Sequence, residues 1–98
     1  MTDRELLELA AKAAGVNGFV VDAGMNFGSD ATPKVWNPLA DDGDALRLAV
    51  KLGLWLHIGK YDVGVHGSPV EEACGKDPYA ATRRAIVRAA AEIGKATP

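Results

Sequence analysis

The strongest constraint on the fold comes from two short segments in the second half of the chain, where apolar residues occupy every second position. This spacing is typical of β-strands, whose successive side chains point to opposite faces of a sheet. A tight turn near Gly59–Lys60 or Tyr61–Asp62 would join the segments as an antiparallel hairpin over about 54–67. Either turn gives the same two faces: an expected core face of Leu54, Leu56, Ile58, Tyr61, Val63 and Val65, and a second face of Trp55, His57, Asp62, Gly64 and His66.

Strand signals outside the hairpin are shorter. A strand is expected over about 70–74, with Val70, Glu72 and Cys74 on one side of it. The segment 16–35 is rich in glycine and other turn residues, and only Phe19–Val21 reads as a short strand. This segment is therefore expected to be irregular, as a mobile flap or as an edge strand.

The first and last helices are clearly delimited. Thr2 and Glu5 have the spacing of a capping box, so a helix is expected over about 2–14. Asp77 and Pro78 open a second one over about 78–94, which Gly94 would end. The expected buried stripes are Leu6, Leu9, Ala10 and Ala13 on the first helix, and Thr82, Ile86, Ala89, Ala90 and Ile93 on the last.

A third helix is expected between them, over about 38–52, with Asn37 as its cap and a short turn before its main part. Three aspartates near its start would lie at the positive end of the helix dipole. Only Arg47 and Lys51 are polar after Asp44, so this helix is expected to be well buried. Its expected inner face is Leu46, Ala49, Val50 and Gly53, broadened by Leu48 and Leu52.

Length and composition narrow the class. The 98 residues are expected to form one domain over 1–98. A net charge of −2 disfavours a nucleic-acid partner. The only cysteine, Cys74, cannot form an internal disulfide, and no apolar run or signal peptide suggests a membrane or export route. The expected location is therefore the cytoplasm, with no membrane contact.

These elements predict an α+β fold, a compact α-β-α sandwich in which helices flank a small, mostly antiparallel sheet of three or four strands. A sheet this small leaves its edges accessible. We therefore expect a homo-oligomer, with a dimer favoured, formed by edge pairing or by packing of sheet faces.

The second face of the hairpin is the first candidate site. His57, His66 and Asp62 lie on it beside Trp55, and two imidazoles with a carboxylate are acceptable zinc ligands. The same residues would equally suit contact with a ligand or partner, or a half-solvated face with no further role. No familiar metal-binding motif accompanies them, so we assign no metal ion, no cofactor and no catalytic residue.

The last helix supplies the second candidate. Arg83, Arg84 and Arg88 with Lys95 form a cationic row that would suit phosphate groups, although a solvated helix face is the simpler interpretation. Trp36 would either pack against the helix that follows it or cover a ligand cleft. A nucleotide held between Trp36, the hairpin histidines, Arg84 and Arg88 is the most specific hypothesis.

Two motifs carry a family resemblance. The runs WNPLADDGDALRLAV (36–50) and DPYAATRRAIVRAAAEIG (77–94) resemble the phage ABA sandwich domain family, small proteins encoded by bacteriophages and prophages. The resemblance implies a layered α-β-α fold and a phage or prophage origin, with the bacterial cytoplasm as location. The family has no established activity that would transfer to this chain.

Three functional classes follow. The first is a non-enzymatic phage accessory protein that binds a host protein or a small ligand, for instance to counter a host defence. The second is a metal-dependent, hydrolase-like enzyme using His57, His66 and Asp62. The third is a structural or assembly protein of the virion. We favour the first because the sequence contains no recognisable catalytic constellation.

Overall fold

The computed structural model describes residues 1–16, 19–21, 25–27 and 34–98. It contains three helices, α1 (Asp3–Ala14), α2 (Asp42–Leu52) and α3 (Pro78–Ala96). Within these described residues, six short strands form two antiparallel sheets, and the expected α+β class is confirmed. The strands are β1 (Phe19–Val21), β2 (Met25–Phe27) and β3 (Lys34–Trp36) in the first sheet, and β4 (Leu56–Ile58), β5 (Asp62–Val65) and β6 (Glu71–Ala73) in the second.

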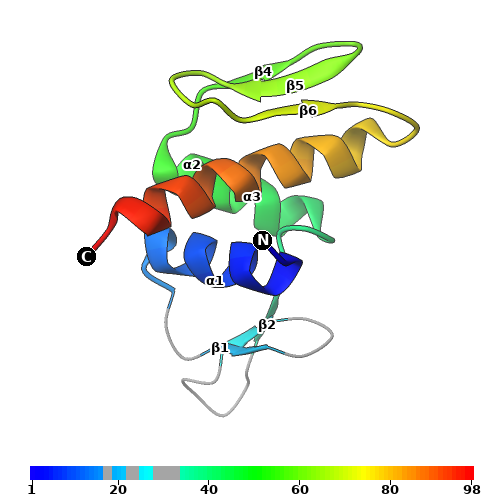
Figure 1. Cartoon of the computed structure of the whole chain (residues 1–98). Helices are drawn as coiled ribbons and strands as arrows, with labels where there is room; N and C mark the ends of the chain where they lie inside the picture. Colours follow the sequence, from blue (N-terminus) through cyan, green and yellow to red (C-terminus); the bar gives the residue numbers. More distant parts are fainter. Residues whose placement is uncertain (17–18, 22–24, 28–33) are drawn as a thin grey trace.

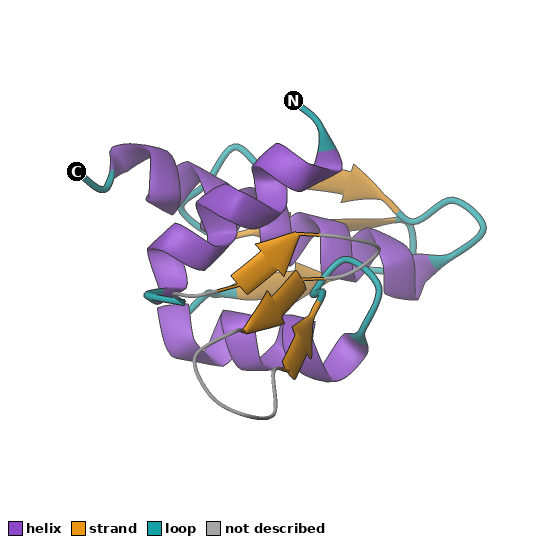
Figure 2. Cartoon of the chain, turned by 90° about the horizontal axis from the view of Figure 1, so that it is seen from below, coloured by secondary structure: helices purple, strands orange, loops and turns teal. Residues whose placement is uncertain are grey.

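Helix α3 lies at the centre of the molecule. The β4–β5–β6 sheet covers one side of it and α1 the other (Figure 1). The β1–β2–β3 sheet lies beyond α1, on the far side of the helices from β4–β6 (Figures 1 and 2). None of the described helices is both long and apolar enough to cross a bilayer.

Small side chains let α3 pack on both sides. Ala85 and Ala89 face the sheet, where Val63, Val65 and Val70 are buried against them. These small side chains permit close approach of α3 to the sheet. The other side of α3 joins the larger core between the helices, formed by Leu6, Leu7, Ala10, Ala11, Ala14, Trp36, Ala45, Leu48, Ala49, Ile86, Val87, Ala90 and Ala91.

The sequence predicted that Gly94 would end α3. This prediction was wrong, because the helix continues to Ala96. Instead, Gly94 is buried where α3 meets α1. A Cβ atom at this position would lie 2.0 Å from the carbonyl oxygen of Leu9 and 2.8 Å from its carbonyl carbon. The absence of a side chain therefore sets how closely the two helix backbones approach.

Helix α1 has the expected start but a different buried face. Thr2 accepts from the backbone N–H of Glu5 at 3.1 Å, and the capping box is complete. The inward positions include Leu7 and Ala11, whereas the expected stripe held Leu9 and Ala13. The face is rotated because α1 packs on both α3 and α2.

Helix α2 starts later and is less buried than expected. Asn37 caps a preceding turn by accepting from the backbone N–H of Leu39 at 3.1 Å, and Asp41 caps the helix itself. The expectation of a well-buried helix was wrong, because Leu46 is 61% and Val50 72% exposed. One face of α2 packs on α1 and α3, and it buries Ala45, Leu48 and Ala49.

The hairpin pairing is confirmed. His57 lies opposite Gly64 and Ile58 opposite Val63, which produces the two expected faces. The expected core face is only half buried, since Ile58 and Tyr61 are largely exposed. The reason is that α3 packs under β5 and β6, whereas β4 is an edge strand beyond it.

Two other strand expectations have clear outcomes. The strand expected over 70–74 is β6, shorter by one residue at each end, and Val70 and Cys74 beside it are buried. Phe19–Val21 is a strand as expected, and β2 and β3 extend it to an antiparallel sheet in place of a flap or a lone edge strand. The turn residues expected at 17–18, 22–24 and 28–33 lie outside the described residues.

Gly94→Ala is expected to lower the free energy of unfolding by about 1–3 kcal/mol, because its methyl group overlaps the Leu9 carbonyl. Helix propensity alone would favour alanine by about 1 kcal/mol. Equilibrium urea unfolding measures the difference. Gly43→Ala is the matched control, since the atoms nearest to its methyl group would be side-chain atoms of Arg47 and Asp41, at 3.1–3.2 Å, and not backbone. Equal effects of the two substitutions would contradict the close helix crossing.

Candidate functional site

The outer face of the β4–β5–β6 sheet brings together most of the hairpin residues singled out from the sequence. Trp55 and His66 are both exposed and stack edge to face, with ring centroids 4.7 Å apart. Their backbones are also joined, because His66 N–H donates to the Trp55 carbonyl at 2.7 Å. His57 and Asp62 lie further along the same face, and both approach Gly59.

These side chains do not form a metal centre. Among the residues that the structure describes, no group of three His, Cys, Asp or Glu side chains could hold a metal ion. The physical reason is that alternate residues of paired strands point outward side by side from one face and do not converge on one atom.

Glu71 is a member of this face that sequence reasoning missed. It lies on β6 opposite Gly64, which places it on the same face as Asp62. A hydrogen bond to Asp62 and the repulsion between the two carboxylates raise the pKa of Glu71 above its usual value. Glu71 becomes a neighbour of Asp62 only through the register in which β6 pairs with β5. The sequence predicted the strand but not its partner or register.

The cationic row on α3 is compensated by acidic partners. Arg84 pairs with Asp3 at 3.1 Å. Arg88 pairs with Glu72 and also donates to the backbone carbonyl of Glu71 at 3.1 Å. The two arginines therefore tie α3 to α1 and to β6, and they do not present an uncompensated row for phosphate groups.

Trp36 lies elsewhere. It ends β3 and is buried in the core between the helices, whereas the hairpin residues Val63 and Val65 belong to a separate cluster. This is the packing role that the sequence offered as one interpretation. The hypothesis of a cleft between Trp36, the histidines and the two arginines is not supported, because Trp36 is buried in the helix core while the histidines are exposed.

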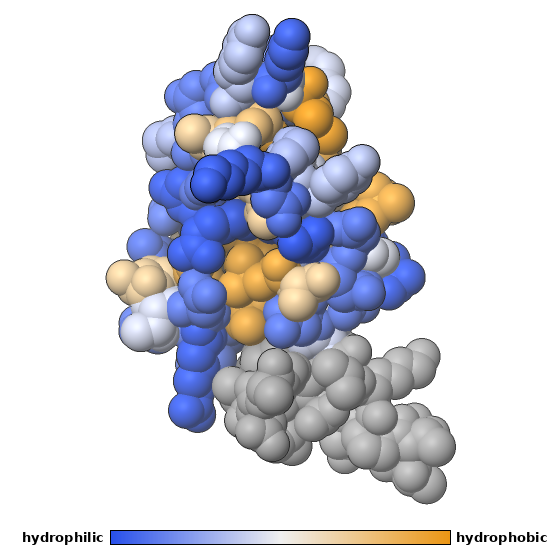
Figure 3. Space-filling view, turned by 90° about the vertical axis from the view of Figure 1, so that its right-hand side faces the viewer, coloured by the Kyte–Doolittle hydropathy of each residue, from blue (hydrophilic) through white to orange (hydrophobic). Residues whose placement is uncertain are grey.

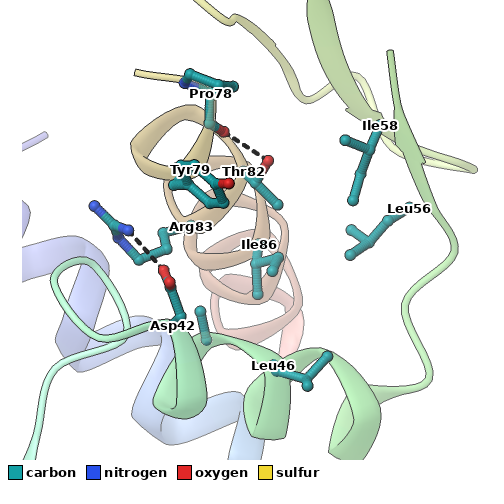
Figure 4. A pocket seen from close by; sticks show the side chains of 10 residues that line it. Asp42, Leu46, Leu56, Ile58, Pro78, Tyr79, Thr82, Arg83 and Ile86 are labelled. Atoms are coloured by element: carbon teal, nitrogen blue, oxygen red, sulfur yellow. Dashed lines mark hydrogen bonds and ion pairs between the residues drawn. The ribbon is translucent and has the colours of Figure 1, made fainter. Parts of the chain in front are cut away.

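An apolar groove lies between α2, β4 and α3, and we call it the α2–β4–α3 groove. It has a volume of about 490 Å³. Ile58 and Leu56 of β4 point across it toward Ile86 of α3, and Leu46 of α2 lies below (Figure 4). The groove is lined by Asp42, Ala45, Leu46, Leu56, Ile58, Pro78, Tyr79, Thr82, Arg83 and Ile86.

The polar groups of this groove are largely engaged with one another. Arg83 donates to Asp42 at 2.6 Å and to the carbonyl of Leu39 at 2.9 Å. The Thr82 hydroxyl donates to the carbonyl of Pro78 at 2.8 Å (Figure 4). What remains open to solvent is mostly hydrocarbon, notably at Leu46, Ile58 and Tyr79.

Figure 3 shows hydrophobic residues reaching the surface in several places on one side of the molecule, among mostly hydrophilic residues. Sequence reasoning assigned Leu46 and Ile58 to the core and missed the groove. A usable signal was that the hairpin and the helix over 38–52 were each predicted to have an apolar face. Only one helix, over 78–94, follows them in the sequence and could cover both faces.

No known family model matches the chain, and no curated protein or solved structure is significantly similar to it.

Glu71→Gln is expected to raise the melting temperature at neutral pH. The raised pKa means that the folded protein holds this proton more tightly than the unfolded chain, so the contribution to stability is lost as pH rises through the raised value. The gain over wild type should disappear at acid pH, where Glu71 is protonated. Thermal unfolding over a pH series measures this. Glu72→Gln, which removes the partner of Arg88, should instead lower the melting temperature, and a gain in both variants would contradict the assignment.

Proposed function

We propose that the chain is a small non-enzymatic binding module of phage or prophage type, whose α2–β4–α3 groove binds a small, largely apolar molecule. The observation that carries this proposal is the groove itself. Its volume of about 490 Å³ falls within the range of small-molecule sites, roughly 300–1,000 Å³.

The chemistry of the lining supports a hydrophobic ligand. Leu46 and Ile58 are each 61% exposed, and Tyr79 also leaves much of its ring in water. Covering such side chains contributes on the order of 1–2 kcal/mol each, before the entropy lost on binding is subtracted. Selectivity would come from the end of the groove where Arg83 and Asp42 form their ion pair, next to the Tyr79 ring (Figure 4).

The same lining favours binding over catalysis. Its described ionisable side chains are Asp42, Arg83 and Tyr79, and the first two are paired with each other. Neither a nucleophile next to a base nor a pair of free carboxylates lines the groove in the described part of the chain. A protein of this kind would act by sequestering its ligand.

The phage assignment rests on the motifs at 36–50 and 77–94. Both motifs contribute to the groove, the first through Asp42 and Leu46 and the second through Tyr79 and Arg83. A bacterial cytoplasmic location follows from the same resemblance. In that setting, removal of a host small molecule is a plausible counter-defence role.

Leu46→Gln is expected to weaken binding of the apolar fluorophore anilinonaphthalene sulfonate about tenfold, because it replaces an exposed apolar wall of the groove. Fluorescence titration measures the affinity. Val50→Gln is the matched control, since Val50 lies one turn further along α2, is 72% exposed and does not line the groove. Equal affinities of the two variants would contradict the proposal.

Native mass spectra of untagged protein from cells, compared with denatured spectra, would identify the occupant. The expected result is a mass excess of small-molecule size that disappears on denaturation. An excess the size of a protein would assign the groove to a partner chain. A clean mass together with no fluorophore binding would contradict a binding role for the groove.

A further inference from the structure

The open edge of β4 presents backbone groups with a defined direction. His66 N–H donates to the Trp55 carbonyl at 2.7 Å, and Gly59 N–H donates to the Asp62 carbonyl at 2.9 Å. In an antiparallel ladder, residues alternate between bonding the neighbouring strand and pointing away from it. Trp55, His57 and Gly59 therefore bond to β5, and the N–H and C=O groups of Leu56 and Ile58 point outward. β4 is the first strand of its sheet, so no described strand pairs with them.

The two edges of this sheet differ in how well they are protected against pairing with another strand. Strand β6 carries Glu71 and Glu72, and Arg88 donates to both the Glu71 carbonyl and the Glu72 carboxylate. Charged side chains and covering groups of this kind are how proteins prevent edge strands from pairing. The β4 edge has none of these devices, because the stretch 53–59 reads GLWLHIG without a charged residue or proline.

The β4 edge is also self-complementary. If a second copy is placed antiparallel with His57 on the two-fold axis, Leu56 of each copy lies opposite Ile58 of the other. These are the residues whose N–H and C=O groups point outward, so each pair exchanges two hydrogen bonds. On the groove side, Leu56 and Ile58 meet their counterparts, which covers apolar surface that is exposed in the single chain.

We propose that two copies of this chain pair through their β4 edges into one continuous six-stranded antiparallel sheet. This goes beyond the proposed function, because it rests on backbone direction and edge chemistry and does not require the groove to hold a ligand. The pairing is isologous, since the same three residues of each copy form both sides of the contact. It also brings the two α2–β4–α3 grooves next to each other.

Ile58→Pro tests the proposal, because it removes an outward N–H and leaves the ladder bonds between β4 and β5 intact. Sedimentation equilibrium over a concentration series is expected to show a wild-type dimer and a variant that associates on the order of a hundredfold more weakly. Ala73→Pro is the matched control. By the same alternation, the Cys74 N–H bond to the Tyr61 carbonyl at 2.9 Å makes Ala73 an outward position of β6, so this variant should remain dimeric.

Ile58→Lys gives a second variant if proline prevents folding. Residue 58 is 61% exposed, so lysine is compatible with the single chain and places a charge on the edge. It should also be monomeric, with an unchanged circular dichroism spectrum. A monomeric wild type, or a folded Ile58→Lys protein that dimerises like wild type, would overturn the proposal.

A disulfide tests the alignment of the two strands. In a Cys74→Ala background, His57→Cys would place two thiols opposite each other at a non-hydrogen-bonded pair, where Cα atoms are about 4.5 Å apart. Oxidised glutathione should then produce a covalent dimer. Ala73→Cys in the same background should not crosslink, and the reverse pattern would place the contact on β6 and overturn the proposal.

Discussion

The packing of α3 through small side chains is the constraint on which the rest of the structure depends. Alanines face the sheet, and Gly94 lies against the Leu9 carbonyl of α1. One helix thereby serves two layers, which a chain of 98 residues needs because it has few large apolar residues to fill a broad core. Larger residues on either side of α3 would push a layer away and open voids that the chain could not fill.

The position of α3 explains why the groove exists. The helix packs under β5 and β6, so β4 and the outer face of α2 extend beyond it on the same side. Ile58 and Leu46 face each other across this uncovered space, with Ile86 behind them (Figure 4). The apolar groove is therefore a direct result of a three-strand sheet that is wider than the single helix beneath it.

Local patterns predicted most of the fold, and long-range packing accounts for the rest. The shared face of Trp55, His57 and His66 follows from strand alternation, and the helix starts at Thr2 and Asp77 follow from capping chemistry. Burial of Leu46 could not be judged, because it depends on where α3 lies. The partners of the arginines were equally hidden, since Arg83 pairs with Asp42 from 41 residues away. Glu71 joined the candidate face only through the alignment of β6.

The contact of Arg88 with the Glu71 carbonyl has a consequence for the size of any assembly. A sheet with two free edges can add copies at both ends, which is the geometry of a growing fibre. Here the Arg88 guanidinium occupies an outward carbonyl of β6. In the proposed dimer the two β6 edges are the free ones, so strand addition would stop at two copies. One salt-bridged arginine would thus separate a closed pair from open-ended polymerisation.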